Sequence, residues 1–344
     1  MCSRFFLTGG DIVQVGTNYI LRLYDAMIRK SYPQYEIDKC CTYASNLLSR
    51  NLPVLFDAYH VETVLELKHI RINRYHVFHL NQVGKIRQIT APSIALKQRQ
   101  QWILREILNK VPISTHAHGF HTGRSIRTNA LIHANNAYVL CLDIQNFFPS
   151  IPSSAVFQVY RSLGYSNSAA AKLTDLCCYN GRLPQGAPTS PSLSNIIFKP
   201  IDEALAIIAK QANAQYSRYA DDLTFSANED ISHLLSEIKR LLLEYGFQIN
   251  TKKIHWFKPG QPKRITGLTV QNGSVRVPKQ FKRALRQEIY YCKKYGVFTH
   301  LDNVHSEHRI HYREHLYGKA YFVHMIEPEI GAAFLNALDE IQWP

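Results

Sequence analysis

The sequence predicts an α+β protein in which helices cover an antiparallel sheet. The first observation is that short apolar runs alternate with longer amphipathic segments between residues 56 and 277. The second is a Tyr-Ala-Asp-Asp sequence at residues 219–222, which separates two strand-like runs and is typical of a hairpin. The third is a change at Pro278, beyond which only helical patterns follow. We therefore expect an N-terminal helical extension over residues 1–55, a mixed region over 56–277 and a helical region over 278–344.

Composition and charge limit the partners that the chain can have. Its 344 residues suffice for one large or two modest domains, and 46% hydrophobic with 19% charged residues is typical of a folded protein. The formal net charge of +14 favours nucleic acid as the partner, because Lys and Arg gain affinity by releasing counterions from phosphates. No apolar run reaches the length of a membrane span, so we expect no membrane partner and a cytoplasmic location.

The 7 cysteines and 16 histidines form no familiar metal or disulfide pattern. The sequence holds no C-x-x-C pair, so we expect reduced thiols. His308, His311 and His315 fall at helical spacing and could bind a metal, but no Cys or paired acid completes a usual site. We expect these histidines to be structural or to contact RNA.

The N-terminal part predicts helices followed by a basic hairpin. Residues 11–50 look helical, whereas residues 75–80 alternate polar with apolar side chains as a strand does. Gly84 then opens a hairpin whose second strand carries Lys85 and Arg87 on one face. These cations could be the solvated edge of a sheet or a clamp on a nucleoside triphosphate, and we favour the clamp.

The middle of the chain alternates between helices and strands. One strand, residues 138–142, leads into Asp143. A turn rich in Pro and Gly at residues 183–191 gives a rigid backbone that can lie close to a flat ligand. We also expect helices at residues 94–111, 129–133, 153–178 with a break near Gly164, 193–212 and 232–245, and hairpin strands at 264–268 and 275–277.

Carboxylates stand at the ends of these predicted strands. Asp221 and Asp222 alone could form a solvated turn. Asp143 changes this interpretation, because acids converging from different strands supply the hard oxygen ligands of a two-Mg²⁺ site for phosphoryl transfer. We expect Asp143 and Asp221 to bridge two ions about 4 Å apart, with Asp222 as the outer ligand.

The first helix after Pro278 is strongly basic, and its single acid is Glu288. Such a run is usually a solvated helix face, but the skew in sign favours a surface that follows nucleic-acid phosphates. The cations are Lys279, Lys282, Arg283, Arg286, Lys293 and Lys294.

Several of these elements together resemble the reverse transcriptases of bacterial retrons, over most of the chain. Residues 219–222 resemble the metal-binding hairpin of that family, and Asp143 resembles its first catalytic acid. Two further elements narrow the resemblance: Asn-Ala-x-x-His at residues 129–133, and Ile-Thr-Gly at residues 265–267, which resembles the retron Val-Thr-Gly. Ile265 departs from the family's Val but keeps a β-branched apolar side chain.

The resemblance implies a right-hand arrangement of fingers, palm and thumb, with residues 278–344 as an RNA-binding thumb. It implies an RNA-directed DNA polymerase that uses two Mg²⁺ ions and deoxynucleoside triphosphates, primed from the 2′-hydroxyl of a guanosine in a cognate structured noncoding RNA. The product would be a branched RNA–DNA hybrid, msDNA. It also implies a role in anti-phage defence with an accessory effector protein, a toxin.

Roles around the nucleotide follow from the same resemblance. Phe148, five positions after Asp143, matches a side chain that abuts the sugar C2′ and would sterically exclude ribonucleotides. An ordinary core phenylalanine is the other interpretation. Gln185 and Gly186 resemble the loop that lies against the templating base pair. Lys253 could protonate or neutralise the leaving pyrophosphate, with the neighbouring lysine at position 252 as the competing candidate.

RNA contacts are the least determined part of the site. Asn129 and His133 lie one helical turn apart, so both can face one partner, which is either the RNA or the interior of the fold. Both alternatives stay open. Thr266 and Gly267 of the second retron-like element are also assigned to RNA binding.

Other enzymes and one non-enzymatic function fit parts of this pattern. An RNA-dependent RNA polymerase would share the carboxylates but would not place Phe148 against the sugar. A non-retron bacterial reverse transcriptase, of the group II intron or abortive-infection type, is the nearer alternative. A catalytically idle, RNA-binding antitoxin scaffold would be expected to lack a metal ligand, whereas Asp143, Asp221 and Asp222 are all present.

Overall fold

The computed structural model describes residues 16–67, 75–82, 85–304 and 311–343. Its internal contacts divide the chain into two compact units. The first unit comprises Met1–Phe120, Ile144–Ala204 and Lys239–Ile249, and the second comprises His121–Asp143, Leu205–Ile238 and Asn250–Pro344. Residues 278–344 therefore cluster with the strands that carry the acids, and the three-region division remains a prediction.

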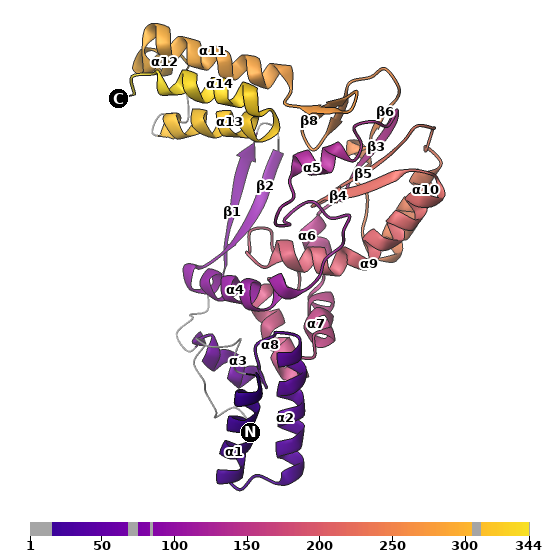
Figure 1. The fold of residues 1–344 in the computed structure, drawn as a ribbon, viewed down its shortest axis with the longest axis vertical. Coiled ribbons are helices and arrows are strands. Elements are labelled where there is room, and N and C mark those ends of the chain that lie inside the picture. The colour runs from indigo at the N-terminus through magenta and orange to yellow at the C-terminus, as the bar shows by residue number, and fades with distance from the viewer. Residues whose placement is uncertain (1–15, 68–74, 83–84, 305–310, 344) are drawn as a thin grey trace. The chain divides into compact units, whose positions relative to one another are not determined.

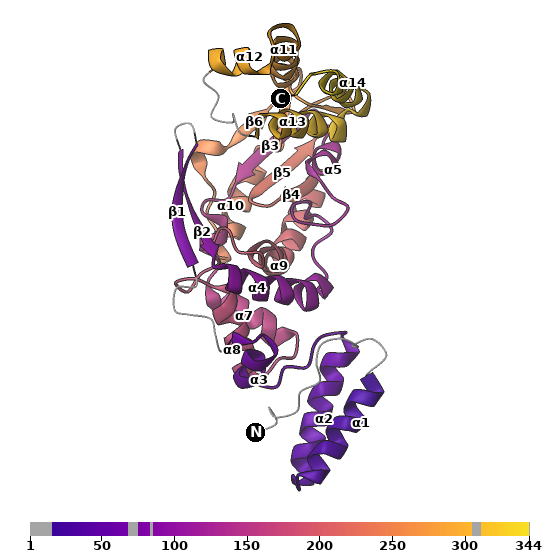
Figure 2. The same cartoon turned by 90° about the vertical axis from the view of Figure 1, so that its left-hand side faces the viewer.

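A four-stranded antiparallel sheet forms the centre of the second unit (Figures 1 and 2). Its strands run in the order β4-β5-β3-β6. The strands β3 and β5 are largely buried, and burial on both faces explains why β3 reads as a continuous apolar run up to its final acid. The bounds are β3 Tyr138–Asp143, β4 Gln215–Tyr219, β5 Asp222–Ala227 and β6 His255–Phe257.

A separate three-stranded meander follows, made of β7 (Lys263–Ile265), β8 (Leu268–Gln271) and β9 (Ser274–Arg276). The sequence predicted a hairpin of the outer strands only, but Leu268–Gln271 forms a middle strand between them. Two tight turns make this possible. Each turn places two successive residues at positive φ, Thr266 with Gly267 and Asn272 with Gly273.

After the meander, the described part of the second unit forms four helices: α11 Lys279–Tyr295, α12 Val297–Val304, α13 Tyr312–Ile326 and α14 Pro328–Asp339. Leu285, Ile289 and Cys292 form the buried stripe of α11. This stripe belongs to one continuous core that also contains Val139 of β3 and Ile265 of β7. The helical region is thus anchored on the sheets by apolar burial.

Glu327, in the turn between α13 and α14, fixes the start of α11. Its carboxylate accepts hydrogen bonds from the backbone N–H of Val277 over 2.9 Å and from Lys282 Nζ over 2.7 Å. Gly331 permits the close crossing of α13 and α14, because a Cβ there would lie 2.1 Å from the backbone of His324.

The first unit is mainly helical, with a core of its own around Met27 and Ile37 of the helix pair α1 and α2. One hairpin among its described residues pairs β1 with β2. The helices α9 and α10 pass from one unit to the other, and α5 belongs to the second unit. The remaining bounds are α1 Gly16–Arg29, α2 Gln34–Ser49, α3 Ala58–Val64, β1 Tyr75–Gln82, β2 Lys85–Pro92, α4 Ile94–Glu106, η3 Leu108–Lys110, α5 Ile126–Leu131, α6 Phe147–Ser150, α7 Ser153–Ser162, α8 Asn167–Cys177, α9 Ser190–Gln211, α10 Leu234–Glu244 and η4 Thr251–Lys253.

Membrane spans and disulfides can be sought directly in the described residues. In the described residues, no helix is long and apolar enough to cross a membrane. Six cysteines lie in the described residues and form no disulfide with one another: Cys40, Cys41, Cys141, Cys177, Cys178 and Cys292.

Candidate active site

The acid hairpin, strands β4 and β5 with the turn between them, brings two of the predicted acids to one end of the sheet. Tyr219 pairs with Asp222, so Ala220 and Asp221 form a two-residue turn. Ala220 has a φ of 57°, which costs an L-residue about 1–2 kcal/mol. Strained turns of this kind are often found at functional sites.

Asp143, the third predicted acid, stands at the end of the adjacent strand. It is the last residue of β3 and the Cα partner of Asp222, the first residue of β5. The antiparallel register therefore places these two acids side by side. Only 7% of Asp143 is exposed, so its charge is poorly solvated.

The electrostatics of this corner are dominated by negative charge. Burial, followed by the charges of Asp221 and Asp143, raises the pKa of Asp222 to about 7, and Lys253 opposes the shift. Asp222 resists ionisation because it is buried and because other acids lie near it, so a bound cation would stabilise its charged form.

Lys253 supplies the positive charge at this corner. Its ammonium forms an ion pair and a hydrogen bond with Asp143 Oδ2. A short turn fixes its backbone: Asn250 N–H donates to the carbonyl of Asp143 over 2.8 Å, and the Asn250 side chain accepts from Lys252 N–H over 3.2 Å. Lys252 itself is exposed. Of the two lysine candidates, the structure places Lys253 at the acids.

The donor set fits Mg²⁺, because Asp143, Asp221 and Asp222 offer only hard carboxylate oxygens. The raised pKa of Asp222 shows that these acids share one electrostatic environment. Within the described part of the chain, no three His, Cys, Asp or Glu side chains enclose a ready-made ion site. Asp143 is instead turned to Lys253.

Asn129 and His133 lie in the interior of the fold. Neither side chain has any exposed surface. The His133 ring lies between the hydroxyls of Ser217 on β4 and Ser226 on β5. The structure thus favours the interior alternative, and the expectation that these two residues contact RNA needs correction, since buried side chains cannot reach a surface ligand.

The Ile-Thr-Gly element at residues 265–267 lies next to α5, the helix in which the Asn-Ala-x-x-His element begins. Thr266 Oγ1 lies 3.5 Å from the carbonyl of Ile126, at the start of α5. Thr266 is half-buried, whereas Gly267 is exposed. RNA binding by these two residues remains a prediction.

The first unit carries the predicted template loop. Gln185 accepts a backbone hydrogen bond from Thr90 N–H of β2 over 2.8 Å. Gly186 has a φ of 127°, and a Cβ there would lie 3.0 Å from the carbonyl oxygen of Thr90. Only glycine allows the loop to lie this close to the strand.

Phe148 lies in α6, beside a phenylalanine that does belong to the core. Phe147 is buried and packs against Phe198 and Phe247, with ring centroids 5.7 Å and 6.0 Å away. Phe148 is only half-buried, and its ring lies 6.2 Å from the ring of Phe120, which is 51% exposed. The structure disfavours the interpretation of Phe148 as an ordinary core residue.

Three predicted residues fall wholly or partly outside the described residues. The backbones of Lys85 and Arg87 form part of β2, as expected, but their side chains are not among those described. His308 lies outside the described residues. Of the same proposed histidine face, His311 is exposed and His315 stacks on Tyr312.

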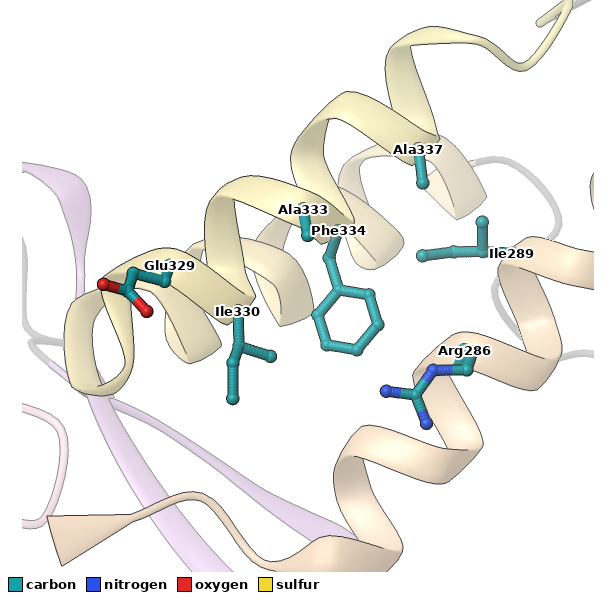
Figure 3. A pocket seen from close by; sticks show the side chains of 7 residues that line it. All are labelled: Arg286, Ile289, Glu329, Ile330, Ala333, Phe334 and Ala337. Atoms are coloured by element: carbon teal, nitrogen blue, oxygen red, sulfur yellow. The ribbon is translucent and has the colours of Figure 1, made fainter. Parts of the chain in front are cut away.

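The cations of α11 differ in what they contact. Lys279 and Arg283 are exposed, whereas Lys282 is tied to Glu327. Arg286 lies over the ring of Phe334 at 5.6 Å and forms one wall of a pocket of about 430 Å³ between α11 and α14 (Figure 3). Lys282 therefore has a structural partner that the sequence did not suggest.

Sequence reasoning missed the serines of the acid hairpin. Ser217 and Ser226 are fully buried polar residues in the two strands of the acid hairpin. Their signal was present, because a small hydroxyl in a buried strand needs a hydrogen-bond partner.

An acid turn in an antiparallel sheet, with a third acid and a lysine beside it, defines the palm of a nucleotidyl-transferring polymerase. The family described as "Reverse transcriptase (RNA-dependent DNA polymerase)" matches residues 79–282. The chain belongs to this family.

Several retron enzymes are among its relatives. The retron Ec86 reverse transcriptase of Escherichia coli is 34% identical over 248 residues, covering 70% of this chain and 78% of that protein. The retron Ec83 enzyme of the same organism is 30% identical, with coverage of 70% and 79%. The retron Mx162 enzyme of Myxococcus xanthus is 32% identical, and the match covers 75% of this chain and 59% of that protein.

Within the family, the chain is therefore a bacterial retron reverse transcriptase, an RNA-directed DNA polymerase. The expected α+β polymerase fold, with an antiparallel sheet and helices, is confirmed. Among solved structures, telomerase from Candida albicans is 10% identical with a TM-score of 0.45, over 90% of this chain and 68% of that one. The fold assignment rests on the sequence relationship and the sheet, not on this weak likeness.

Proposed function

We propose that the chain copies a cognate structured noncoding RNA into DNA at the acid hairpin, by two-metal nucleotidyl transfer. The observation that carries this proposal is the pairing of Asp143 with Asp222 at one edge of the sheet, next to the Asp221 turn and Lys253. Both the acids and the lysine come from one compact unit.

Each residue at this corner has a proposed part in the reaction. Asp143, Asp221 and Asp222 would hold Mg²⁺, which would supply activation of the attacking hydroxyl and charge neutralisation of the leaving group. The Lys253 ammonium neutralises the leaving pyrophosphate or donates a proton to it, since its side chain is 40% exposed and can leave Asp143.

Deoxynucleoside triphosphates are the proposed substrates. Phe148 is half-buried beside a core aromatic cluster, so its ring is held on one side and accessible on the other. Such a ring can exclude a ribose 2′-hydroxyl by contact alone. Lys85 and Arg87 of β2 are proposed to hold the triphosphate, and Gln185 and Gly186 to support the templating pair.

RNA binding is proposed for one face of α11, called the α11 basic face. At 100° per residue, its members fall in a single stripe along the helix. All of them are exposed, and Lys294 Nζ lies 5.4 Å from the ring of Tyr290. Cations with an interleaved aromatic ring suit phosphates and unpaired bases. The members are Lys279, Arg283, Arg286, Tyr290 and Lys294.

The proposed product is msDNA, a DNA joined to the 2′-hydroxyl of a guanosine in the template RNA. We further propose that polymerase and product act in anti-phage defence and restrain an accessory effector protein. Both proposals are supported by the relationship of the chain to the retron reverse transcriptases.

Sequencing the nucleic acid that co-purifies with the chain tests this function. The expected result is one RNA species covalently joined through a 2′–5′ linkage to a complementary DNA. The matched control is the Asp221→Asn variant, which should carry the RNA without the DNA. Unbranched DNA or random cellular RNA in the wild-type sample would contradict the retron product.

A further inference from the structure

A chain of side-chain hydrogen bonds, buried except at Asn136, joins α5 and the turn after it to both strands of the acid hairpin. Asn136 Nδ2 donates to Ser226 Oγ over 2.6 Å, and this oxygen lies 2.6 Å from His133 Nδ1. On the opposite ring edge, His133 Nε2 lies 2.8 Å from Ser217 Oγ. Ser217 in turn donates to Asn129 Oδ1 over 2.8 Å. One imidazole thus bridges β4 and β5.

The available protons give this network a direction. Because Ser217 donates its hydroxyl proton to Asn129, its oxygen accepts the Nε2–H of His133. Ser226 accepts from Asn136 and donates its own proton to His133 Nδ1. A neutral imidazole protonated on Nε2 satisfies both serines, an assignment that follows from the network.

The network acts on the sheet face that carries the acid. Side chains alternate along a strand, so Ser226 and Asp222 point to the same face of β5. Ser217 stands two residues before Tyr219, the cross-strand partner of Asp222. The turn between the strands holds Ala220 at a φ of 57°, a conformation that its own sequence does not favour.

The turn after α5 is hydrogen-bonded to the meander β7–β9. Gly273 N–H donates to the carbonyl of Ala134 over 3.1 Å, and Lys263 Nζ donates to the carbonyl of Asn136. Ala130 and Ala134 also share a core with Ile265. The bridge from α5 therefore starts from a fixed support.

Stability alone does not account for this choice of residues. Asn129 Nδ2 is buried and has no hydrogen-bond partner among the described residues. An unpaired buried donor costs free energy, and an apolar side chain would avoid this cost. The residue is better explained by what its oxygen holds in place.

We infer that His133, Ser217 and Ser226 are positioning residues that hold the Asp221–Asp222 turn in its reactive geometry, and that they do not bind RNA. The inference deepens the proposed function, because it requires that the acid hairpin be the polymerase site. Misplacing a reacting group by about 1 Å can cost about 10²-fold in rate.

The test compares two variants that lose a hydroxyl, Ser217→Ala and Ser226→Ala, with Ser217→Thr, which keeps a hydroxyl at the same position. Ser194→Ala is the matched control, because Ser194 is equally buried but its hydroxyl donates to the nearby backbone carbonyl of Pro191 and not to a group of the acid hairpin. For each purified protein, kcat and KM for dNTP, the Mg²⁺ concentration for half-maximal rate, and the Kd for the cognate RNA are measured at a fixed interval below its own Tm.

Both alanine variants should lose at least about tenfold in kcat and need more Mg²⁺, with KM and RNA Kd within about twofold of wild type. Ser217→Thr should recover kcat, and Ser194→Ala should keep it. Wild-type kcat in both alanine variants overturns the inference, and so does a loss that follows RNA Kd. An inactive wild-type protein would instead contradict the proposed function.

Discussion

Asp143 and Asp222 are direct cross-strand partners, the last residue of β3 and the first residue of β5. A one-residue slip in register would turn the acid face of β5 to the opposite side of the sheet. Because β3 and β5 are buried along most of their length, the apolar core fixes this register. The position of the acids therefore follows from the packing of the sheet.

The acid corner should destabilise the metal-free protein. The folded pKa of Asp222, about 7, lies above the ordinary aspartate value of 3.8, so between these pH values the folded state binds more protons than the unfolded state. The stability that this group contributes is fully present below about pH 4 and is lost as the pH rises through about 7. Asp222→Asn should raise the free energy of unfolding by about 1–2 kcal/mol at pH 8 and by less at pH 5.

Urea unfolding in EDTA at the two pH values measures this difference. The control is Asp25→Asn, an exposed acid on α1. An Asp222→Asn variant that is no more stable than wild type at pH 8 would contradict the electrostatic description of the corner.

Replacing Lys253 should lower kcat far more than replacing Lys252. Lys253→Ala removes the only cation seen beside Asp143 in the described residues, and we expect kcat to fall by about 10²-fold. Lys252→Ala is the matched control and should stay within about twofold, because Lys252 is exposed. Single-turnover primer extension distinguishes them, and equal losses in both variants would reject the assignment.

Phe148→Ala should relax sugar selection. Alanine is too small to clash with the 2′-hydroxyl of a ribonucleotide. The ratio of ribonucleotide to deoxynucleotide incorporation should therefore rise by at least about tenfold. The control is Phe120→Ala, which removes a nearby exposed ring. Competition between rNTP and dNTP on one template gives the ratio directly. An unchanged ratio in Phe148→Ala would show that the ring is no gate.

Neutralising the α11 basic face should weaken RNA binding in a salt-dependent way. Lys279→Gln with Arg283→Gln removes two exposed cations, so the slope of log Kd against log salt should fall by about 1.5. Lys239→Gln with Arg240→Gln, on α10, removes the same charge elsewhere. If both pairs change the slope equally, the effect comes from net charge and not from this face.

Some features of the site could be predicted from sequence because they are local. Asp221 and Asp222 follow a strand-like run and open another, and Asp143 ends a third, so the acid positions follow from apolar patterning. The choice between Lys252 and Lys253 could not be made, because it depends on a short turn that Asn250 caps.

Other features depend on contacts between distant segments. His133 and Ser226 are far apart in the chain, and only the folded sheet brings them to 2.6 Å. The partner of Lys282, Glu327, is equally distant in sequence. The middle strand β8 was missed because its run is short and both of its turns need residues at positive φ.

The most direct test of the central claim, that these acids form the polymerase site, is labelled dNTP incorporation by the purified chain with its co-purified RNA and Mg²⁺, with RNA Kd measured on the same samples. Wild type should extend DNA, whereas Asp221→Asn should lose incorporation by at least about 10³-fold with RNA Kd within about twofold. Incorporation by Asp221→Asn at the wild-type rate would contradict the claim.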